Sequence, residues 1–181
     1  MNKACNRATL AALGALLTLQ MPLAGTAVAD PSTPLIDAVR NATARYLDIN
    51  QAFRDGFVTA TPCVSGPDTG AMGVHLVLPA RIGAGVLDPT KPEALIYEPM
   101  PDGTMRFVGV EFIVLESVWV SNNPNGGVPA LEGNLLNYIA APNRYGLPAF
   151  YEIHVWAWQN NPRGSYADWN TQVTCAHQPL S

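Results

Sequence analysis

The chain has 181 residues, which is enough for one ordinary domain with a buried core. Its formal net charge is −4, and its ten Lys and Arg residues are scattered singly along the chain. Because they form no basic cluster, nucleic acid and anionic membrane surfaces are poor partners for this protein.

The first residues have the three parts of a secretory signal peptide. Lys3 and Arg7 form a basic start, and residues 9–23 are apolar. Ala27-Val28-Ala29 follows as a small-x-small site that a signal peptidase can cut. We therefore predict a cleavable signal peptide over residues 1–29.

The apolar stretch is too short for a membrane anchor. A spanning helix needs about 20 apolar residues, and Gln20 and Pro22 interrupt this one. No other segment of the sequence is long and apolar enough to span a bilayer. The expected product is a single domain over residues 30–181, secreted or periplasmic, and loss of the two basic residues of the signal peptide changes its net charge to −6.

Two cysteines remain after this cleavage, Cys63 and Cys175. An even number of cysteines in an exported chain predicts a disulfide bond. The alternative is a pair of buried free thiols. A bond between them would tie the start of the folded region to its tail.

The first expected element is a long helix. Thr33 can cap it, Pro34 suits its first position, and Gly56 is a good stop. An apolar stripe with helical spacing runs between these signals and indicates packing against a sheet: Leu35, Val39, Ala42, Tyr46, Ile49 and Phe53.

The rest of the sequence is typical of strands and loops. Pro101-Asp102-Gly103 predicts a turn that joins the second and third strands into a hairpin. Residues 81–92 are expected to form a connection, residues 119–143 an irregular segment, and residues 165–169 a helical turn. The four expected strands are Met72–Leu78, Ala94–Pro99, Thr104–Glu116 and Ala149–Trp158. This order predicts an α+β fold, with the N-terminal helix packed on a curved antiparallel sheet.

Three polar residues stand out because they lie in apolar strands. His75 and His154 are both mid-strand, and a buried imidazole needs hydrogen-bond partners. Glu111 lies on a mostly apolar face, where a carboxylate needs a cation, a metal or several donors. Two histidines and one carboxylate can form a facial triad that holds a divalent metal ion and leaves positions open for oxygen or substrate. Glu152 is a candidate outer-shell partner.

Strand alternation predicts which side chains share the faces around these residues. Gly109, on the face of Glu111, would leave room for a ligand or a large ring. The two expected sets of neighbours are Met105, Phe107, Gly109, Glu111, Ile113 and Leu115 in the third strand, and Glu152, His154, Trp156 and Trp158 in the fourth.

Other interpretations of these residues stay open at this point. The site could be a pocket for a small ligand without a metal, or the histidines could be hydrogen-bonded core residues. Glu111 could form an ion pair with Arg81 or Arg144, or with Arg106 of a neighbouring molecule. A carboxylate pair drawn from Glu98, Glu111 and Glu152 could cleave sugars or cell-envelope material. The domain could also be a structural or interaction module without a site.

Ten segments spread over most of the chain after residue 29 carry a resemblance to a known family. They are Ala52–Phe57, Pro62–Val64, Gly70–His75, Asp88–Tyr97, Val108–Phe112, Tyr145–Pro148, His154–Trp158, Asn161-Pro162, Trp169-Asn170 and Cys175. These segments resemble a family of secreted bacterial proteins that has no assigned activity. The resemblance implies export and a single domain, and it assigns no role to His75, Glu111 or His154.

Overall fold

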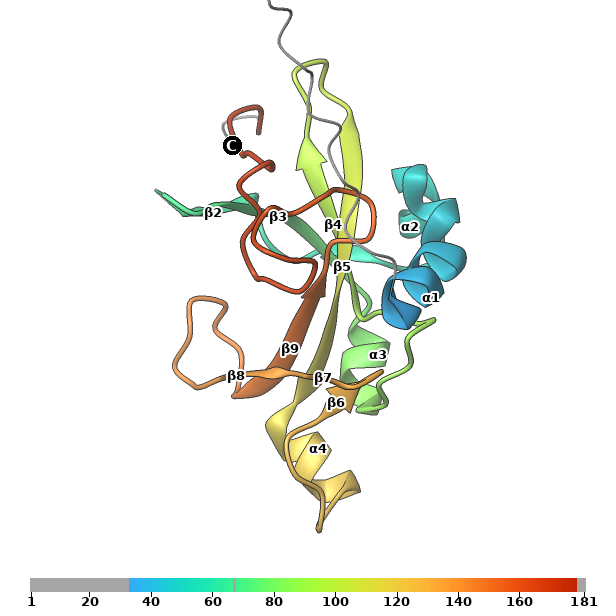
Figure 1. Cartoon of the computed structure of the whole chain (residues 1–181), viewed down its shortest axis with the longest axis vertical. Helices are drawn as coiled ribbons and strands as arrows, with labels where there is room; N and C mark the ends of the chain where they lie inside the picture. Colours follow the sequence, from blue (N-terminus) through green and yellow to red (C-terminus); the bar gives the residue numbers. More distant parts are fainter. Residues whose placement is uncertain (1–32, 67, 179–181) are drawn as a thin grey trace, which may run out of the picture.

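The computed structural model describes residues 33–66 and 68–178, so the expected signal peptide over residues 1–29 lies outside the described residues. Helices and an antiparallel sheet make up the described part, which confirms the α+β class (Figure 1). In chain order the elements are α1 (Pro34–Thr43), η1 (Ala44–Leu47), α2 (Ile49–Arg54), β1 (Val58–Thr59), β2 (Val64–Gly66), β3 (Gly70–Val77), α3 (Pro79–Ala84), β4 (Ala94–Pro99), β5 (Met105–Leu115), α4 (Glu116–Asn122), β6 (Ala130–Leu131), β7 (Asn134–Leu135), β8 (Asn137–Ile139) and β9 (Phe150–Val155).

The main sheet has the strand order β1-β3-β4-β5-β9-β8, and β2 adds to β3 outside this path. All of these pairs are antiparallel. The expected hairpin between β4 and β5 is confirmed, since Gly103 takes the positive φ of +80° that its turn requires. The sheet thereby places β3, β5 and β9, which carry the three candidate ligands, within four consecutive strands.

The expected long helix is wrong in detail, because the structure divides it into α1, a short 3₁₀ helix η1, and α2. Thr33 caps α1 as predicted, by accepting from the Ile36 amide. Asp48 starts a new helix by accepting from the Asn50 amide. This break shifts the phase of the apolar stripe, so Ala52 is fully buried while Phe53 is 49% exposed.

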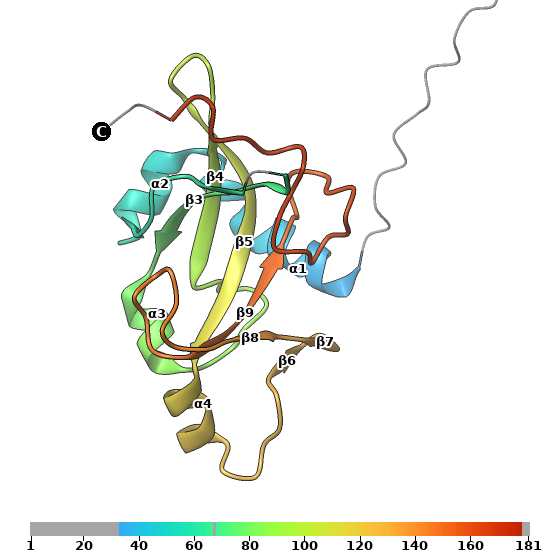
Figure 2. The same cartoon turned by 90° about the vertical axis from the view of Figure 1, so that its left-hand side faces the viewer.

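The two faces of the sheet have different covers. α1, η1 and α2 pack on one face, in the largest apolar cluster of the described residues. The C-terminal segment and the loop before β9 lie over the other face (Figures 1 and 2). That second face holds two smaller apolar clusters, one around Ile96, Val108 and Trp156, the other around Ala94, Ile113 and Phe150.

The expected alternation of side chains in β5 is wrong around Val108, because the strand contains a bulge. The register shifts so that Ile96 pairs with Gly109 while Tyr97 pairs with Phe107, which leaves Val108 as the extra residue. Phe107 therefore faces the helices, and Val108 takes its place on the other face. Gly109 leaves no room for a ligand, since a Cβ there would lie 2.7 Å from the Val155 carbonyl oxygen.

The expected alternation in β9 is also wrong beyond Val155, where the strand ends. The strand stops at Val155, so the period of two does not continue to Trp158. Trp156 stays on the face of His154, whereas Trp158 packs in the helix-side cluster and donates from Nε1 to Thr43 Oγ1.

The expected secondary structure was wrong in three further segments, because their sequences carry no strong local signal. The connection expected over residues 81–92 begins within a short helix, α3, and the irregular segment over residues 119–143 contains most of α4 together with β6, β7 and β8. Residues 165–169 form turns and bends without the expected helical turn. In the described part of the chain, no helix is long and apolar enough to cross a membrane.

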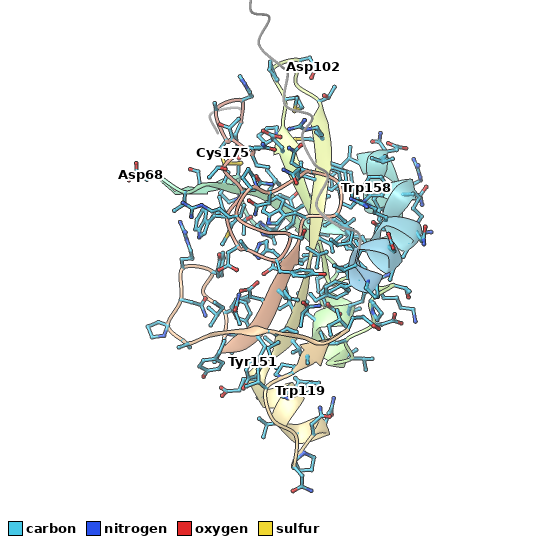
Figure 3. The ribbon with its side chains drawn as sticks, in the orientation of Figure 1. Asp68, Asp102, Trp119, Tyr151, Trp158 and Cys175 are labelled. Carbon is cyan, nitrogen blue, oxygen red and sulfur yellow. A yellow bond between two sulfur atoms is a disulfide. The ribbon has the colours of Figure 1, made fainter. Side chains whose placement is uncertain are left out.

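The predicted disulfide bond is confirmed. Cys63 and Cys175 are joined, with their Cα atoms 5.5 Å apart and a sequence separation of 112 residues (Figure 3). Next to it, the buried carboxylate of Glu98 accepts from the Thr174 amide at 3.0 Å. The C-terminal segment is thus fixed at the face of the sheet that carries the candidate ligands.

Removal of this bond should lower stability without changing the fold. We expect the Cys63→Ala/Cys175→Ala double variant to lose about 2–5 kcal/mol of unfolding free energy, because the unfolded chain regains the freedom of a long loop. Urea denaturation followed by circular dichroism measures this loss. An unchanged midpoint would show that the other contacts of the tail hold it equally well.

Candidate metal centre

The sheet brings the three predicted residues together on the face away from the helices. Glu111 of β5 and His154 of β9 are direct cross-strand partners, and Ala94 of β4 lies opposite Glu111 on its other side. His75 of β3 pairs with Ile96, one step along the same face. Because Ala94 has only a methyl group, the imidazole of His75 can reach across β4 toward Glu111.

The donor atoms of these side chains converge at one point. His75 Nε2 lies 3.5 Å from His154 Nε2 and 3.5 Å from Glu111 Oε2. One donor atom from each of the three residues lies within 4.8 Å of the other two. The three residues are only 2–7% exposed, so the point where they meet is screened from bulk water.

Each imidazole is held from its other side. His75 Nδ1 lies 3.2 Å from Thr61 Oγ1, and the Gly73 backbone also hydrogen-bonds this ring. His154 Nδ1 lies 3.0 Å from Glu152 Oε2. These contacts engage both Nδ1 atoms and turn both Nε2 atoms toward Glu111.

Two further residues fix the carboxylate behind His154. Asn137 Nδ2 donates to Glu152 Oε1 at 3.2 Å and to Asp168 Oδ1 at 3.1 Å. Asp168 Oδ1 is also 3.9 Å from His154 Nδ1. Asn137 therefore bridges two acidic side chains that would otherwise repel each other beside the imidazole.

Burial and mutual charge shift the protonation of the centre. Burial lowers the pKa of His75 to about 3, and the charge on His154 acts in the same direction. Burial also opposes the charge on His154, but Glu111, Glu152 and Asp168 together outweigh it and raise its pKa to about 9. Burial raises the pKa of Glu111 to about 8, against the attraction of His154. Near neutral pH the centre therefore holds one neutral and one protonated imidazole.

One hydrogen between the two Nε2 atoms satisfies the cluster. Two Nε2 lone pairs at 3.5 Å would repel each other, so one nitrogen must carry a hydrogen that points at the other. The raised pKa of His154 and the lowered pKa of His75 place this hydrogen on His154. Among the described residues, no buried side-chain nitrogen or oxygen lacks a hydrogen-bond partner. The same donor atoms could hold a cation.

A cavity of about 140 Å³ opens beside the centre. His75 and Glu111 contribute to its wall, and His154 does not. The remaining lining residues are mostly apolar: Ala60, Thr61, Val77, Ile113, Tyr145, Leu147 and Phe150. A cation held by the three donors would therefore face this space on one side.

The ion pair considered for Glu111 is not present in the described part of the chain. There its carboxylate lies 3.5 Å from the neutral imidazole of His75, and the positive charge that attracts it is on His154. Arg81 instead donates to the Pro92 carbonyl at 2.7 Å, and the Arg144 guanidinium lies over the ring of Trp169 at 5.9 Å. The carboxylate is thus balanced by imidazoles and not by an arginine.

The other two glutamates considered for a carboxylate pair have different surroundings. Glu98 forms an ion pair with Arg106, its cross-strand partner, and anchors the tail. Glu152 lies behind His154, as expected of an outer-shell partner. Of the three, only Glu111 lines the cavity.

Sequence reasoning did not find several residues of this centre. Thr61, Tyr145 and Asp168 come from loops, and Asn137 comes from a three-residue edge strand. None of them carries a periodic pattern that would place it at this point. Only the packing of the covering segments brings them to the cluster.

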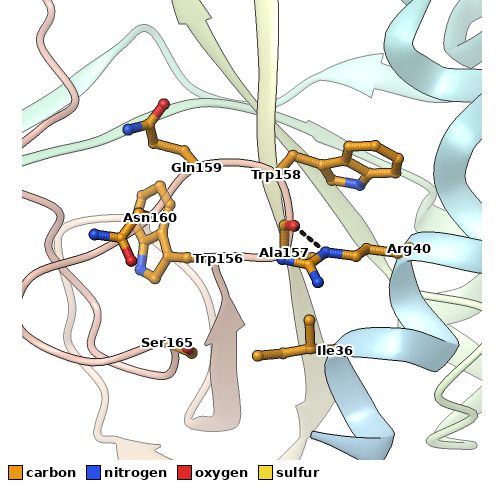
Figure 4. A pocket seen from close by; sticks show the side chains of 8 residues that line it. All are labelled: Ile36, Arg40, Trp156, Ala157, Trp158, Gln159, Asn160 and Ser165. Carbon is orange, nitrogen blue, oxygen red and sulfur yellow. Dashed lines mark hydrogen bonds between the residues drawn. The ribbon is translucent and has the colours of Figure 1, made fainter. Parts of the chain in front are cut away.

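A second hollow, of about 260 Å³, lies between Trp156, Trp158 and α1 (Figure 4). Arg40 crosses it and donates from Nε to the Ala157 carbonyl at 2.7 Å. The ring of Trp156 is nearly parallel to that of His154, with centroids 6.1 Å apart. Trp156 therefore separates this hollow from the histidine pair and gives the centre an adjacent fluorescent group.

No family model matches the chain, and no curated protein or solved structure is significantly similar to it.

The depressed pKa of His75 makes a pH-dependent prediction for the metal-free protein. Between pH 6.5 and 3 the unfolded chain protonates this histidine while the folded chain does not, so its contribution to stability falls as the pH falls. We expect the unfolding free energy of the natural protein, relative to a His75→Gln variant, to fall by about 2 kcal/mol from pH 7 to pH 5.

Denaturation of chelator-treated protein at several pH values measures this difference. The raised pKa of Glu111 acts in the opposite direction, but it is common to both proteins. His177→Gln, in the exposed tail, is the matched control and should show no such change. Parallel pH profiles for the natural protein and the His75→Gln variant would contradict the assignment of a buried neutral imidazole.

Proposed function

We propose that this protein binds one divalent metal ion through His75 Nε2, His154 Nε2 and the carboxylate of Glu111. The observation that supports it is the convergence of these three donors on one buried face, with His75 Nε2 3.5 Å from each of the other two and all three within 4.8 Å of one another. Nitrogen and oxygen donors of this kind suit zinc, copper, iron and nickel.

The spacing of the donors favours a tetrahedral ion. Two atoms bound at about 2.0–2.2 Å to one tetrahedral ion lie about 3.3–3.6 Å apart. Neighbouring ligands of an octahedral ion at about 2.0–2.1 Å would be closer, at about 2.9 Å. The two distances from His75 Nε2, both 3.5 Å, fit zinc with three protein ligands and a fourth position left open. The donor atoms of His154 and Glu111 lie within 4.8 Å of each other and would have to move closer together to share the ion.

The outer contacts are those that a metal-binding histidine needs. A ligating imidazole normally donates from its second nitrogen to a carboxylate, a carbonyl or water, which fixes its tautomer and its orientation. Glu152 supplies that partner for His154, and Thr61 Oγ1 lies at the second nitrogen of His75. The ligand atoms are thus oriented before any ion arrives.

Metal binding would displace protons from the centre. Each ligand must be deprotonated to bind an ion, and the raised pKa values of His154 and Glu111 favour their protonated forms. Ion binding therefore releases protons, and affinity should increase with pH.

The proposed role is metal-dependent binding of a small ligand in the adjoining cavity, since His75 and Glu111 line its wall. A confirmed disulfide is typical of an oxidising compartment, which supports a secreted or periplasmic location. The signal peptide and the resemblance to secreted bacterial proteins stay predictions. So does the hydrolase alternative, which no observation favours, because Glu98 and Glu152 lie outside the cavity.

Elemental analysis of the exported protein, purified without chelator or affinity metal, tests the proposal. We expect about one metal ion per chain in the natural protein, and loss of that ion in the His75→Ala and His154→Ala variants, because each removes one of three ligands. His177→Ala is the control, since this histidine is exposed and is not among the residues whose donor atoms converge.

Circular dichroism must show that the variants keep their fold. Zinc titration of the chelated protein, followed by the fluorescence of Trp156 beside His154, gives a second measurement. Failure to bind zinc, copper, iron and manganese salts would overturn the proposal and leave the histidines as hydrogen-bonded core residues.

The outer carboxylate makes a graded prediction. Glu152→Gln keeps the size of the side chain but removes the charge that His154 Nδ1 faces. We expect zinc affinity to fall about 10–100-fold, the usual effect of losing an outer-shell partner. Competition with a chromophoric chelator measures it, and Glu132→Gln on an exposed turn is the matched control. Equal affinities in the two variants would show that Glu152 does not orient the ligand.

A further inference from the structure

The cavity beside the centre has two chemically different ends. One end is formed by the candidate ligands His75 and Glu111. Apolar side chains line the rest: Ala60, Val77, Ile113, Leu147 and Phe150. A molecule that fits this space must have one polar end, directed at the metal position, and an apolar remainder.

The volume limits the size of that molecule. An apolar cavity of about 150 Å³ in another protein holds one benzene molecule. The present cavity, at about 140 Å³, therefore suits a ligand of about six non-hydrogen atoms.

Tyr145 supplies a hydrogen-bond donor within the cavity wall. Its hydroxyl has Met72 Sδ, 3.5 Å away, as its described partner, and thioether sulfur is a weak acceptor. Asn143 Oδ1 accepts from the amides of Tyr145 and Leu147, both at 3.2 Å, which holds this loop in place. The phenol is therefore positioned to donate to a better acceptor.

Charge balance decides between a neutral and an anionic ligand. A divalent ion with Glu111 and the nearby Glu152 already forms a neutral group on a face that is almost closed to solvent, and Asp168 is a further acidic side chain beside it. An added anion would leave one uncompensated charge in apolar surroundings, which is costly. A neutral oxygen atom adds no charge.

We infer that the open position of the metal ion takes the carbonyl oxygen of a small neutral ketone or aldehyde, and that Tyr145 donates a hydrogen bond to the same oxygen. A carbonyl oxygen has two lone pairs, so one can coordinate the ion while the other accepts from the phenol. The apolar walls then enclose the carbon skeleton. This inference rests on the metal site proposed above.

The test uses the full-length exported protein loaded with Co²⁺, whose visible spectrum reports on its ligands. Cyclopentanone, with six non-hydrogen atoms, is the probe, and acetate is the anionic comparison. We expect a saturable spectral change with cyclopentanone at millimolar concentration and a weaker response to acetate. Cobalt content is measured in every sample, so that loss of the metal is distinguished from loss of the ligand.

Two variants test the parts of the site without touching a metal ligand. Tyr145→Phe should raise the dissociation constant of cyclopentanone about two- to tenfold, because one hydrogen bond is lost. Tyr138→Phe, at a tyrosine outside the cavity wall, should leave it unchanged. Ala60→Phe, at an exposed lining residue, should fill the space and abolish the response while cobalt stays bound.

The outcomes separate the two proposals. Bound cobalt without a response to cyclopentanone, or tighter binding of acetate than of cyclopentanone, would overturn this inference and leave the metal site standing. An unchanged constant in Tyr145→Phe would overturn the assigned hydrogen bond. Failure to bind cobalt at all would overturn both the metal site and the inference that rests on it.

Discussion

The cross-strand pair of Glu111 and His154 places a carboxylate and an imidazole side by side on a buried face. Burying such groups is costly unless each finds a partner of opposite charge or a hydrogen bond. His75, Glu152 and Asp168 supply those partners, and the two apolar clusters of this face lie around Ile96 and around Ala94. This burial depends on three parts of the structure. β3 brings His75 to the pair, while the C-terminal segment and the loop before β9 cover this face of the sheet.

The C-terminal segment covers the centre and shields it from solvent, and several contacts fix it to the sheet. The disulfide bond and the hydrogen bond to Glu98 hold its end, while Ala71 and Asn170 exchange two backbone hydrogen bonds of 3.1 Å further back. Trp156 Nε1 donates to the Ala167 carbonyl, one residue before Asp168. The covalent tie and the polar cluster are therefore parts of one arrangement, because loosening the tail would expose the carboxylates that hold His154.

The same arrangement explains why a proton and a metal ion compete at this point. The outer partners engage both Nδ1 atoms, so both Nε2 atoms face inward with Glu111. A hydrogen on one Nε2 atom relieves the repulsion of their lone pairs. A divalent ion would replace that hydrogen while using the same donors. Whether the protein binds metal is therefore a question of affinity against pH, which elemental analysis and titration measure directly.

Local patterns were enough to predict the helix cap at Thr33, the turn at Gly103, the hairpin, the disulfide and the choice of His75, Glu111 and His154. All but the disulfide depend on neighbours in the sequence, and a polar residue in an apolar strand is a local anomaly. The disulfide followed from the count of two cysteines in an exported chain. The break at Asp48 also had a local signal, its capping side chain. The extra residue Val108, the turn of Trp158 and the arrival of Thr61, Tyr145 and Asp168 had none. Only the tertiary structure decided these, because strand register and loop cover depend on packing between segments that lie far apart in the sequence.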